Sequence, residues 1–155
     1  MITNSARRRT LATADYQGLA ELRYRLRQFA VFSEGAARLT GLTAQQHQAL
    51  LAVLGFPGKQ HVTIGALAER LGLRHHSAVG LVDRLVARRL LRRSHGARDR
   101  RQVWVDVTPR ARALLARLAR VHRDELRRVA PLLRALLQRL GTPRRLVRGG
   151  GRRAT

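Results

Sequence analysis

The spacing of apolar residues predicts long amphipathic helices toward both ends of the chain. From Asp15 to Leu39, apolar residues recur every three or four positions, which is the period of one helical face. A second helix is expected to begin at Thr43, because a glutamine follows three residues later, as in a capping box. Thr108 starts another long helix. We expect Pro131 to interrupt it, so that residues 132–140 form a separate, leucine-rich last helix.

The centre of the chain carries the pattern of a helix-turn-helix. Residues 61–64 favour a short strand, and the apolar positions of residues 64–71 favour a short amphipathic helix. Gly72 suits the left-handed backbone conformation that ends many helices. Ser77 then begins a second periodic run after a short turn. A short helix, a glycine-containing turn and a second helix together predict a helix-turn-helix.

A β-hairpin is predicted immediately after these helices. Leu90–Arg93 and Gln102–Val107 favour strands, and residues 94–101 form the turn between them. In the second strand the valines face one side, while Trp104 and Asp106 face the other. A hairpin that directly follows a helix-turn-helix is a wing.

The chain is strongly basic, which favours a polyanionic partner. Its 155 residues carry a net charge of +23, so nucleic acid is the expected partner and an anionic membrane surface is the alternative. There is no cysteine, and no apolar run is long enough to span a bilayer. Without a secretory signal, we expect a cytoplasmic protein. The composition predicts a flexible basic arm (residues 1–14), a folded domain (15–140) and a disordered basic tail (141–155).

The chain resembles the multiple antibiotic resistance regulator (MarR) family over roughly Leu19 to Leu140, and the order and spacing of four motifs carry the resemblance. The motifs are LTAQQ at 42–46, IGALAERLGLRHHSAVGLVDRL at 64–85, DRR at 99–101 and VWVDVT at 103–108. The resemblance implies a mainly α (α+β) fold, with a winged helix-turn-helix DNA-binding lobe and a helical dimerisation region. It also implies a homodimer that binds double-stranded DNA at a palindromic operator, as a repressor that a small ligand relieves.

The chain departs from the family pattern at three positions. Family members often have glycine where Arg89 stands, between the recognition helix and the wing, and glycine near Ala111. They often have threonine where Gly80 stands. Gly80 removes a possible contact with a base or a phosphate, and it lowers helix stability by ~1 kcal/mol relative to alanine.

The second helix and the wing supply the candidate DNA-binding residues. Recognition helices contact base edges mainly through their N-terminal residues, and an arginine can enter a narrow minor groove from a wing. The candidates are Arg74, His75, His76, Ser77 and Arg84 in the helix, and Arg98, Arg100 and Arg101 in the wing. The resemblance supports Arg101 as the inserted residue.

Two of these assignments have structural alternatives. Asp99 is expected to organise the wing by accepting hydrogen bonds from turn amides or from a nearby guanidinium. The alternative is a solvated charged turn that contacts nothing. For Ser77, the alternative to a DNA contact is a local capping role at the start of the helix.

Relatives in the family bind aromatic molecules between the dimer helices and the DNA-binding lobe. By this resemblance, four apolar residues would line a cleft for a small aromatic effector, although they can equally be plain core. These residues are Leu26, Phe29, Phe32 and Leu50. His75 and His76 lie about 100° apart on a helix and do not converge on one metal ion. We expect no metal, no cofactor and no membrane partner. Because no catalytic motif is evident, we also expect no enzymatic activity.

The leading hypothesis is therefore a homodimeric transcription regulator. One alternative is a sequence-nonspecific architectural DNA-binding protein, which the net charge and the basic ends favour. The other is an RNA-binding protein that uses a winged helix. The ratio of specific to random-DNA affinity at fixed salt separates these functions, because electrostatic affinity alone carries no sequence information.

Overall fold

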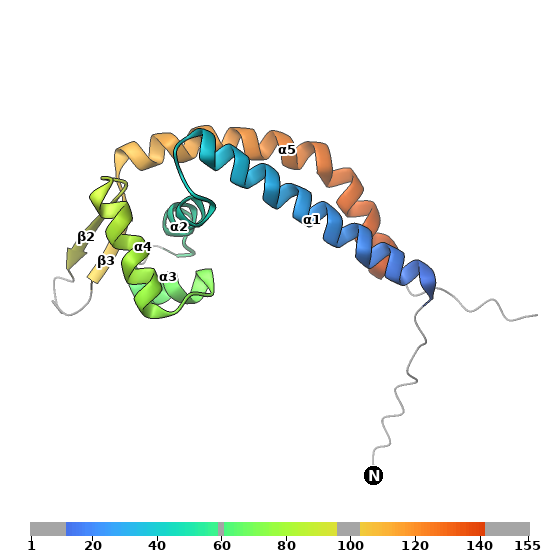
Figure 1. Cartoon of the computed structure of the whole chain (residues 1–155), viewed down its shortest axis with the longest axis horizontal. Coiled ribbons are helices and arrows are strands. Elements are labelled where there is room, and N and C mark those ends of the chain that lie inside the picture. The colour runs from blue at the N-terminus through green and yellow to red at the C-terminus, as the bar shows by residue number, and fades with distance from the viewer. Residues whose placement is uncertain (1–11, 59–60, 96–102, 142–155) are drawn as a thin grey trace, which may run out of the picture. The chain divides into compact units, whose positions relative to one another are not determined.

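The computed structural model describes residues 12–58, 61–95 and 103–141 as a mainly helical chain with one small sheet (Figure 1). The elements in chain order are α1 (Thr13–Leu39), α2 (Ala44–Leu54), β1 (Val62–Thr63), α3 (Ile64–Leu71), α4 (His75–Ala87), β2 (Leu91–His95), β3 (Val103–Val107) and α5 (Pro109–Gly141). This is the expected mainly α (α+β) class, and the elements follow the predicted order of a winged helix-turn-helix.

The internal packing divides the chain into two compact units. One comprises Met1–Gln28 and Arg127–Thr155, and the other comprises Phe29–Leu126. We call the first the terminal unit and the second the central unit. Helices α1 and α5 each contribute residues to both units.

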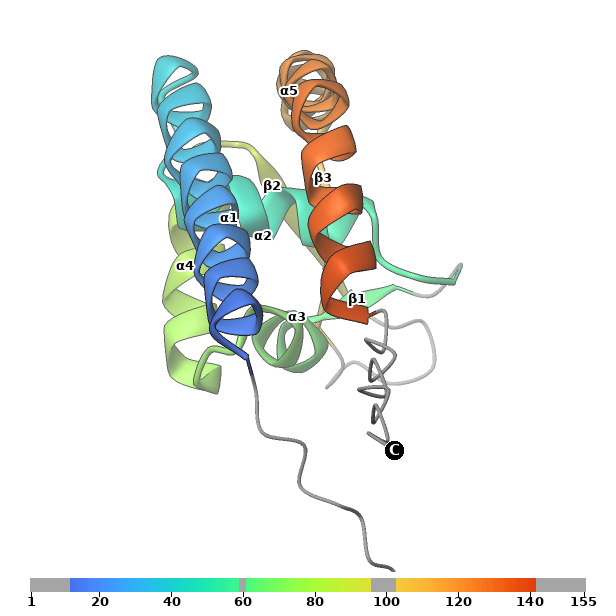
Figure 2. The ribbon, with the colours of Figure 1, turned by 90° about the vertical axis from the view of Figure 1, so that its right-hand side faces the viewer.

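The central unit is built around one apolar core of leucine, valine and alanine. Helices α2, α3 and α4 and strands β2 and β3 all contribute to it. Its largest fully buried side chains are Leu42, Leu50, Leu67, Leu81, Val82, Leu85, Leu91 and Val105. Helices α3 and α4 lie side by side in Figure 1 and remain neighbours in the perpendicular view of Figure 2. The core therefore holds both helices of the predicted helix-turn-helix.

The sheet has three antiparallel strands in the order β1–β3–β2. Val105 of β3 is fully buried and pairs with Val62 on one side and Arg93 on the other. Trp104, on the opposite face of β3, stacks on His61 with the ring centroids 3.9 Å apart. This alternation confirms the predicted faces of the strand.

The helix ends predicted at Thr43, Gly72 and Thr108 are capped, and Thr63 caps a further helix. Thr43 and Gln46 form a reciprocal capping box at the start of α2. The hydroxyls of Thr63 and Thr108 each accept the backbone N–H three residues further on, at 3.2 Å. Gly72 ends α3 with a φ angle of 64°, in the left-handed region.

Two predicted boundaries are wrong by a few residues. Helix α4 begins at His75 rather than Ser77, because Arg74 is extended and its carbonyl already accepts the N–H of Ser77. The apolar period begins later than the helix, since the first turn of α4 faces solvent. Strand β2 continues through Ser94 and His95, which pair with residues of β3 and shorten the expected turn.

The prediction that Pro131 separates two helices is also wrong. Pro131 lies inside α5, which runs from Pro109 to Gly141 as one helix. Proline removes one backbone hydrogen bond and crowds the preceding turn. The leucine, arginine and alanine residues around it have high helix propensities, so the helix continues past the missing bond.

The terminal unit brings the start of α1 close to the end of α5. Gly18 is buried against Leu140, and a Cβ atom at Gly18 would lie 2.9 Å from Leu140 Cδ2. The same unit leaves several large apolar side chains 44–59% exposed. They are Tyr16, Leu19, Tyr24, Leu26, Leu132 and Leu137.

Candidate nucleic-acid interface

The helix-turn-helix consists of α3, a turn at Gly72 and α4. Gly72 ends α3, and the N–H of Leu73 donates to the carbonyl of Ala68, which closes the turn. The buried side of α4 comprises Ala78, Leu81, Val82 and Leu85. Because these residues anchor α4 in the core, the opposite side of the helix is held toward solvent.

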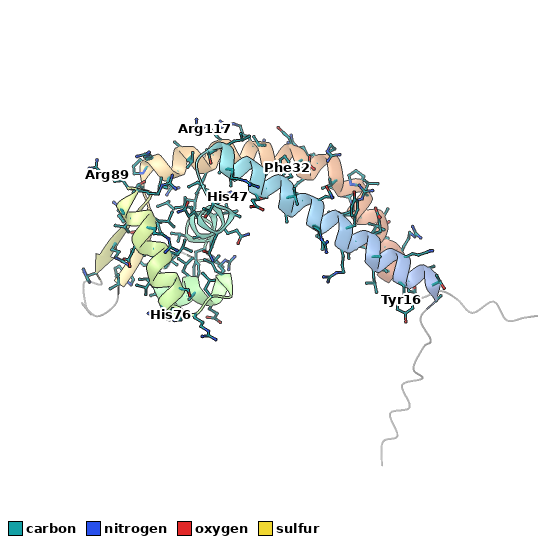
Figure 3. All side chains as sticks on the ribbon, viewed as in Figure 1. Tyr16, Phe32, His47, His76, Arg89 and Arg117 are labelled. Carbon is teal, nitrogen blue, oxygen red and sulfur yellow. The ribbon has the colours of Figure 1, made fainter. Side chains whose placement is uncertain are left out.

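The predicted recognition residues lie together on the exposed part of α4. Arg74 is the residue before the helix, His75, His76 and Ser77 form its first turn, and Arg84 lies further along. All five are exposed, and Figure 3 labels His76 at the exposed end of α4. The Arg74 side chain does not cap the helix. A helix start of this kind can receive an anion such as a phosphate at its first amide groups.

Gly80 lies on the same helix, beneath the side chain of Arg84. A Cβ atom at Gly80 would be 3.5 Å from Arg84 Nη1, which is an ordinary van der Waals distance. Packing therefore does not require glycine here.

Arg88 fixes the C-terminal end of α4 and was not singled out by the sequence. Its Nη1 donates to Gln46 Oε1 at 2.8 Å, and its Nη2 donates to the carbonyl of Gly41 at 2.9 Å. Gln46 Oε1 also accepts the backbone N–H of Thr43 in the capping box of α2. The start of α2 and the end of the recognition helix are thus tied together by one arginine.

Arg89 makes the connection from α4 to the sheet in a left-handed backbone conformation, with a φ angle of 56°. The N–H of Arg89 donates to the carbonyl of Val86, and the carbonyl of Arg89 accepts a hydrogen bond from the Thr108 hydroxyl at 2.9 Å. This conformation explains why the family often has glycine at this position, since only glycine adopts it without a steric cost.

Arg92 and Arg93 of β2 each form an ion pair. Arg93 Nη1 lies 2.7 Å from Asp83 Oδ1, which links β2 to α4. Arg92 Nε lies 3.8 Å from Asp106 Oδ2, across the β2–β3 pair. The predicted tip residues Arg98, Asp99, Arg100 and Arg101 lie outside the described residues.

The four predicted effector residues are divided between the two compact units. Phe29 and Phe32 lie in the central unit, with their ring centroids 6.2 Å apart. Leu50 is fully buried in the core of this unit, which was the alternative interpretation. Leu26 belongs to the terminal unit and is 52% exposed.

A pair of histidines lies beside these phenylalanines, and the sequence did not reveal it. The His122 ring centroid is 6.0 Å from that of Phe29, 5.6 Å from that of Phe32 and 4.9 Å from that of His47. Figure 3 labels Phe32 on α1 and His47 on α2. The two histidines are far apart in the sequence, so only the fold brings them together.

Two hydrogen bonds define the orientation of the His122 ring, whereas the His47 side chain is buried. His122 Nδ1 lies 2.8 Å from the carbonyl oxygen of Leu118, and Nε2 lies 2.8 Å from Ser33 Oγ. Since a carbonyl only accepts, Nδ1 carries a hydrogen and donates to Leu118, and Nε2 shares a hydrogen bond with the Ser33 hydroxyl. Burial, and secondly the nearby His122, lower the pKa of His47 below its ordinary value.

The described residues form no cluster of three or more His, Cys, Asp or Glu side chains that would suit a metal ion. In the same part of the chain, no helix combines the length and the apolar character that a bilayer span requires.

Comparison with known proteins agrees with this geometry. The sequence model of the MarR family matches residues 40–102, whereas no curated protein matches the chain. CouR from Rhodococcus jostii RHA1, bound to p-coumaroyl-CoA, is 23% identical, with a TM-score of 0.62 over 87% of this chain and 99% of that chain. MepR, a transcription regulator of the Staphylococcus aureus multidrug efflux pump MepA, is 14% identical, with a TM-score of 0.64 over 71% of this chain and 79% of that chain.

A mutant of S. aureus MepR bound to an oligodeoxyribonucleotide is 14% identical, with a TM-score of 0.63 over 84% of this chain and 96% of that chain. These likenesses show the winged-helix fold of MarR-type regulators. The family consists of transcription regulators rather than enzymes. The family model thus agrees with the resemblance over residues 40–102, and the solved structures show that the chain shares the fold.

Proposed function

We propose that this chain, whose residues 40–102 carry the MarR-family winged helix-turn-helix, is a sequence-specific transcription regulator that binds DNA as a homodimer in the cytoplasm. The exposed side of α4 is the observation that carries this proposal. It gathers Arg74, His75, His76, Ser77 and Arg84 on a helix anchored in the core. Side chains of these types can contact base edges and phosphates in a major groove.

The wing would add contacts beside the recognition helix. Arg98, Arg100 and Arg101 are the proposed arginines of its tip, with Arg101 in the minor groove, and Asp99 is the proposed organiser. Strands β2 and β3 support this assignment, because they place the two ends of the tip next to each other in the sheet.

The proposed dimer would use the exposed apolar residues of the terminal unit. Leu132 and Leu137 of α5 are about half exposed, as are Tyr16 and Leu26 of α1. Soluble monomers rarely expose so many large apolar side chains together. A twofold dimer would place two recognition helices on a palindromic operator.

We further propose that a small aromatic effector relieves repression. CouR, one of the structural relatives, is bound to p-coumaroyl-CoA. In this chain, Phe29, Phe32 and the histidine pair supply aromatic surface in the central unit. We retain Leu26 and Leu50 in the proposed effector set with less structural support, because Leu50 is core and Leu26 is in the terminal unit.

The test is a selection of DNA by the full-length protein. Duplexes of about 30 base pairs accommodate two half-sites one helical turn apart, so a random pool of this length is sufficient. We expect a palindrome to be enriched and to bind at least roughly 10³-fold more tightly than a random duplex at the same salt concentration. In the same titration, an RNA hairpin added as competitor should displace the enriched duplex no better than random DNA does.

Other outcomes would identify the alternatives. An affinity that is high for every duplex and falls steeply with salt would indicate an architectural protein, which the charge of +23 would then explain. Displacement of the enriched duplex by the RNA hairpin at lower concentration would indicate an RNA-binding protein.

A further inference from the structure

The recognition helix carries an acidic residue on its exposed side. Asp83 follows the buried Val82 and precedes the exposed Arg84, and its side chain is 55% exposed. The chain has 9 acidic residues against 32 basic ones, so a carboxylate at this position is unexpected in a protein of this charge. An unpaired carboxylate beside a DNA backbone would repel the phosphates.

The carboxylate of Asp83 is held by an arginine from the wing. Arg93 Nη1 lies 2.7 Å from Asp83 Oδ1, a short charge-assisted contact. The Arg93 side chain is 32% exposed, so the pair is partly shielded from water. The negative charge of Asp83 is therefore neutralised within the protein.

The ion pair between Asp83 and Arg93 joins strand β2 of the wing to the recognition helix α4. In the described sheet, β2 is an edge strand, because β3 lies between it and β1. Arg93 is in the middle of β2 and pairs with Val105 of β3. The side-chain contact from Asp83 thus links the hairpin to the recognition helix.

A second ion pair in the same hairpin provides a contrast. Arg92 and Asp106 are separated by 3.8 Å, and both lie on the strands of the wing. This longer pair links β2 to its own partner strand and does not reach α4. Asp106 therefore serves as a matched acidic residue without the linking contact.

We propose that Asp83 is a positioning residue for DNA reading, which acts by holding the wing hairpin against the recognition helix through Arg93. This inference rests on the proposed DNA-binding function. In this arrangement Asp83 contacts no base. Its role is to keep β2 and α4 in the geometry in which both can engage one duplex.

Two simpler roles for Asp83 predict different results. If its charge only repelled DNA, removing the charge would strengthen binding to every duplex. If Asp83 accepted a hydrogen bond from cytosine, removing its charge would relax the preference at one base pair. A positioning role predicts that the affinity for the selected site falls. The base preference at each position of the site should then stay as in the wild type.

The experiment compares Asp83→Asn with Asp106→Asn in the full-length protein. The probes are the duplex enriched from the random pool by the wild type and a random duplex, at one salt concentration. We expect Asp83→Asn to weaken binding to the enriched duplex by about two- to fivefold, the scale of a partly exposed ion pair. Binding to the random duplex should be unchanged or stronger, and Asp106→Asn should leave the ratio of the two affinities as in the wild type.

The double variant Asp83→Asn with Arg93→Gln tests whether the two side chains act as one unit. Arg93→Gln should cost less affinity for the enriched duplex in the Asp83→Asn background than in the wild type. Additive losses would overturn the proposal. A relaxed preference at one base pair would overturn it in favour of direct base reading.

Amide hydrogen exchange of β2 provides a readout that needs no DNA. In Asp83→Asn, the amides of residues 91–95 should exchange faster than in the wild type, while Asp106→Asn has a smaller effect. Unchanged exchange and an unchanged affinity ratio would overturn this inference and leave the proposed function intact. Failure of the wild type to enrich any duplex would instead overturn the proposed function, and this inference with it.

Discussion

Arg89 is the only residue other than glycine, among those that the structure describes, whose φ angle is positive. A side chain in the left-handed region costs roughly 1–2 kcal/mol, because its Cβ approaches the backbone too closely. The conformation persists because the backbone around Arg89 is tied to Val86 and to the hydroxyl of Thr108. A single residue thus carries strain at the connection between the recognition helix and the wing.

Replacing Arg89 by glycine should relieve this strain. The gain is partly offset by the larger unfolded-state entropy of glycine, so we expect Arg89→Gly to raise the free energy of unfolding by about 0.5–1 kcal/mol. Urea unfolding followed by circular dichroism measures it. Arg89→Ala is the matched control, because it removes the same charge but keeps a Cβ atom. Equal stabilisation by both variants would show that charge, and not backbone strain, is responsible.

His47 makes the stability of the central unit depend on pH. Its pKa is lowered from 6.5 in the folded state, chiefly by burial and secondly by His122 of α5. From α1, the neutral side chains of Ser33, Phe29 and Phe32 surround His122. The unfolded chain therefore binds a proton more readily than the folded chain at this position. The stabilising contribution is fully present above pH 6.5 and is lost as the pH falls below it.

We therefore expect the free energy of unfolding to fall between about pH 7.5 and pH 5, and to fall less in His47→Gln. Urea unfolding at the two pH values measures this difference. His76→Gln, at an exposed position of α4, should retain the pH dependence of the wild type. If the free energy of unfolding of His47→Gln falls with pH as steeply as that of the wild type, other groups cause the loss of stability in acid.

At the scale of elements, α5 retains a proline within a helix of 33 residues. Pro131 is exposed and lacks the N–H that would bond to the preceding turn. Pro131→Ala should stabilise α5 by as much as about 3 kcal/mol, which thermal unfolding measures. Pro109→Ala is the control, because Pro109 is the first residue of the helix and its missing N–H costs nothing there. A similar gain from both variants would contradict this account.

The parts of the fold that the sequence predicted depend on local signals. The capping box at Thr43, the left-handed Gly72 and the alternating valines of β3 each need only a few neighbouring residues. The uninterrupted α5 was missed because the surrounding propensities outweigh one proline. The start of α4 was missed because its first turn is exposed and leaves no apolar signal.

The parts of the site that the sequence missed are contacts between distant segments. Arg88 reaches Gln46 and Gly41 across the central unit, and no local pattern distinguishes it from the other arginines. The contact of Asp83 with Arg93 likewise depends on how β2 lies against α4. The helical candidates for DNA binding were found because they lie at the start and on the exposed side of one helix whose opposite side is apolar.

At the scale of the whole molecule, a net charge of +23 opposes association of two copies. A dimer must therefore be held by apolar burial in the terminal unit. In α5, the buried Leu136 and the exposed Leu132 and Leu137 occupy one broad side of the helix, with spacings of four and five residues. The contact with α1 does not cover this apolar side completely, since Leu137 is still 57% exposed.

Leu137→Glu should therefore convert the proposed dimer to a monomer, because two buried carboxylates would replace an apolar contact. Sedimentation velocity at micromolar concentration should show twice the chain mass for the wild type and the chain mass for the variant. Gln138→Glu introduces the same charge at an exposed position opposite the middle of this side of the helix and should remain a dimer. The monomer should also bind the enriched duplex far less tightly, because only one recognition helix then engages it, while its affinity for random DNA changes little. A wild-type monomer that binds the palindrome tightly would contradict both the dimer and the twofold operator.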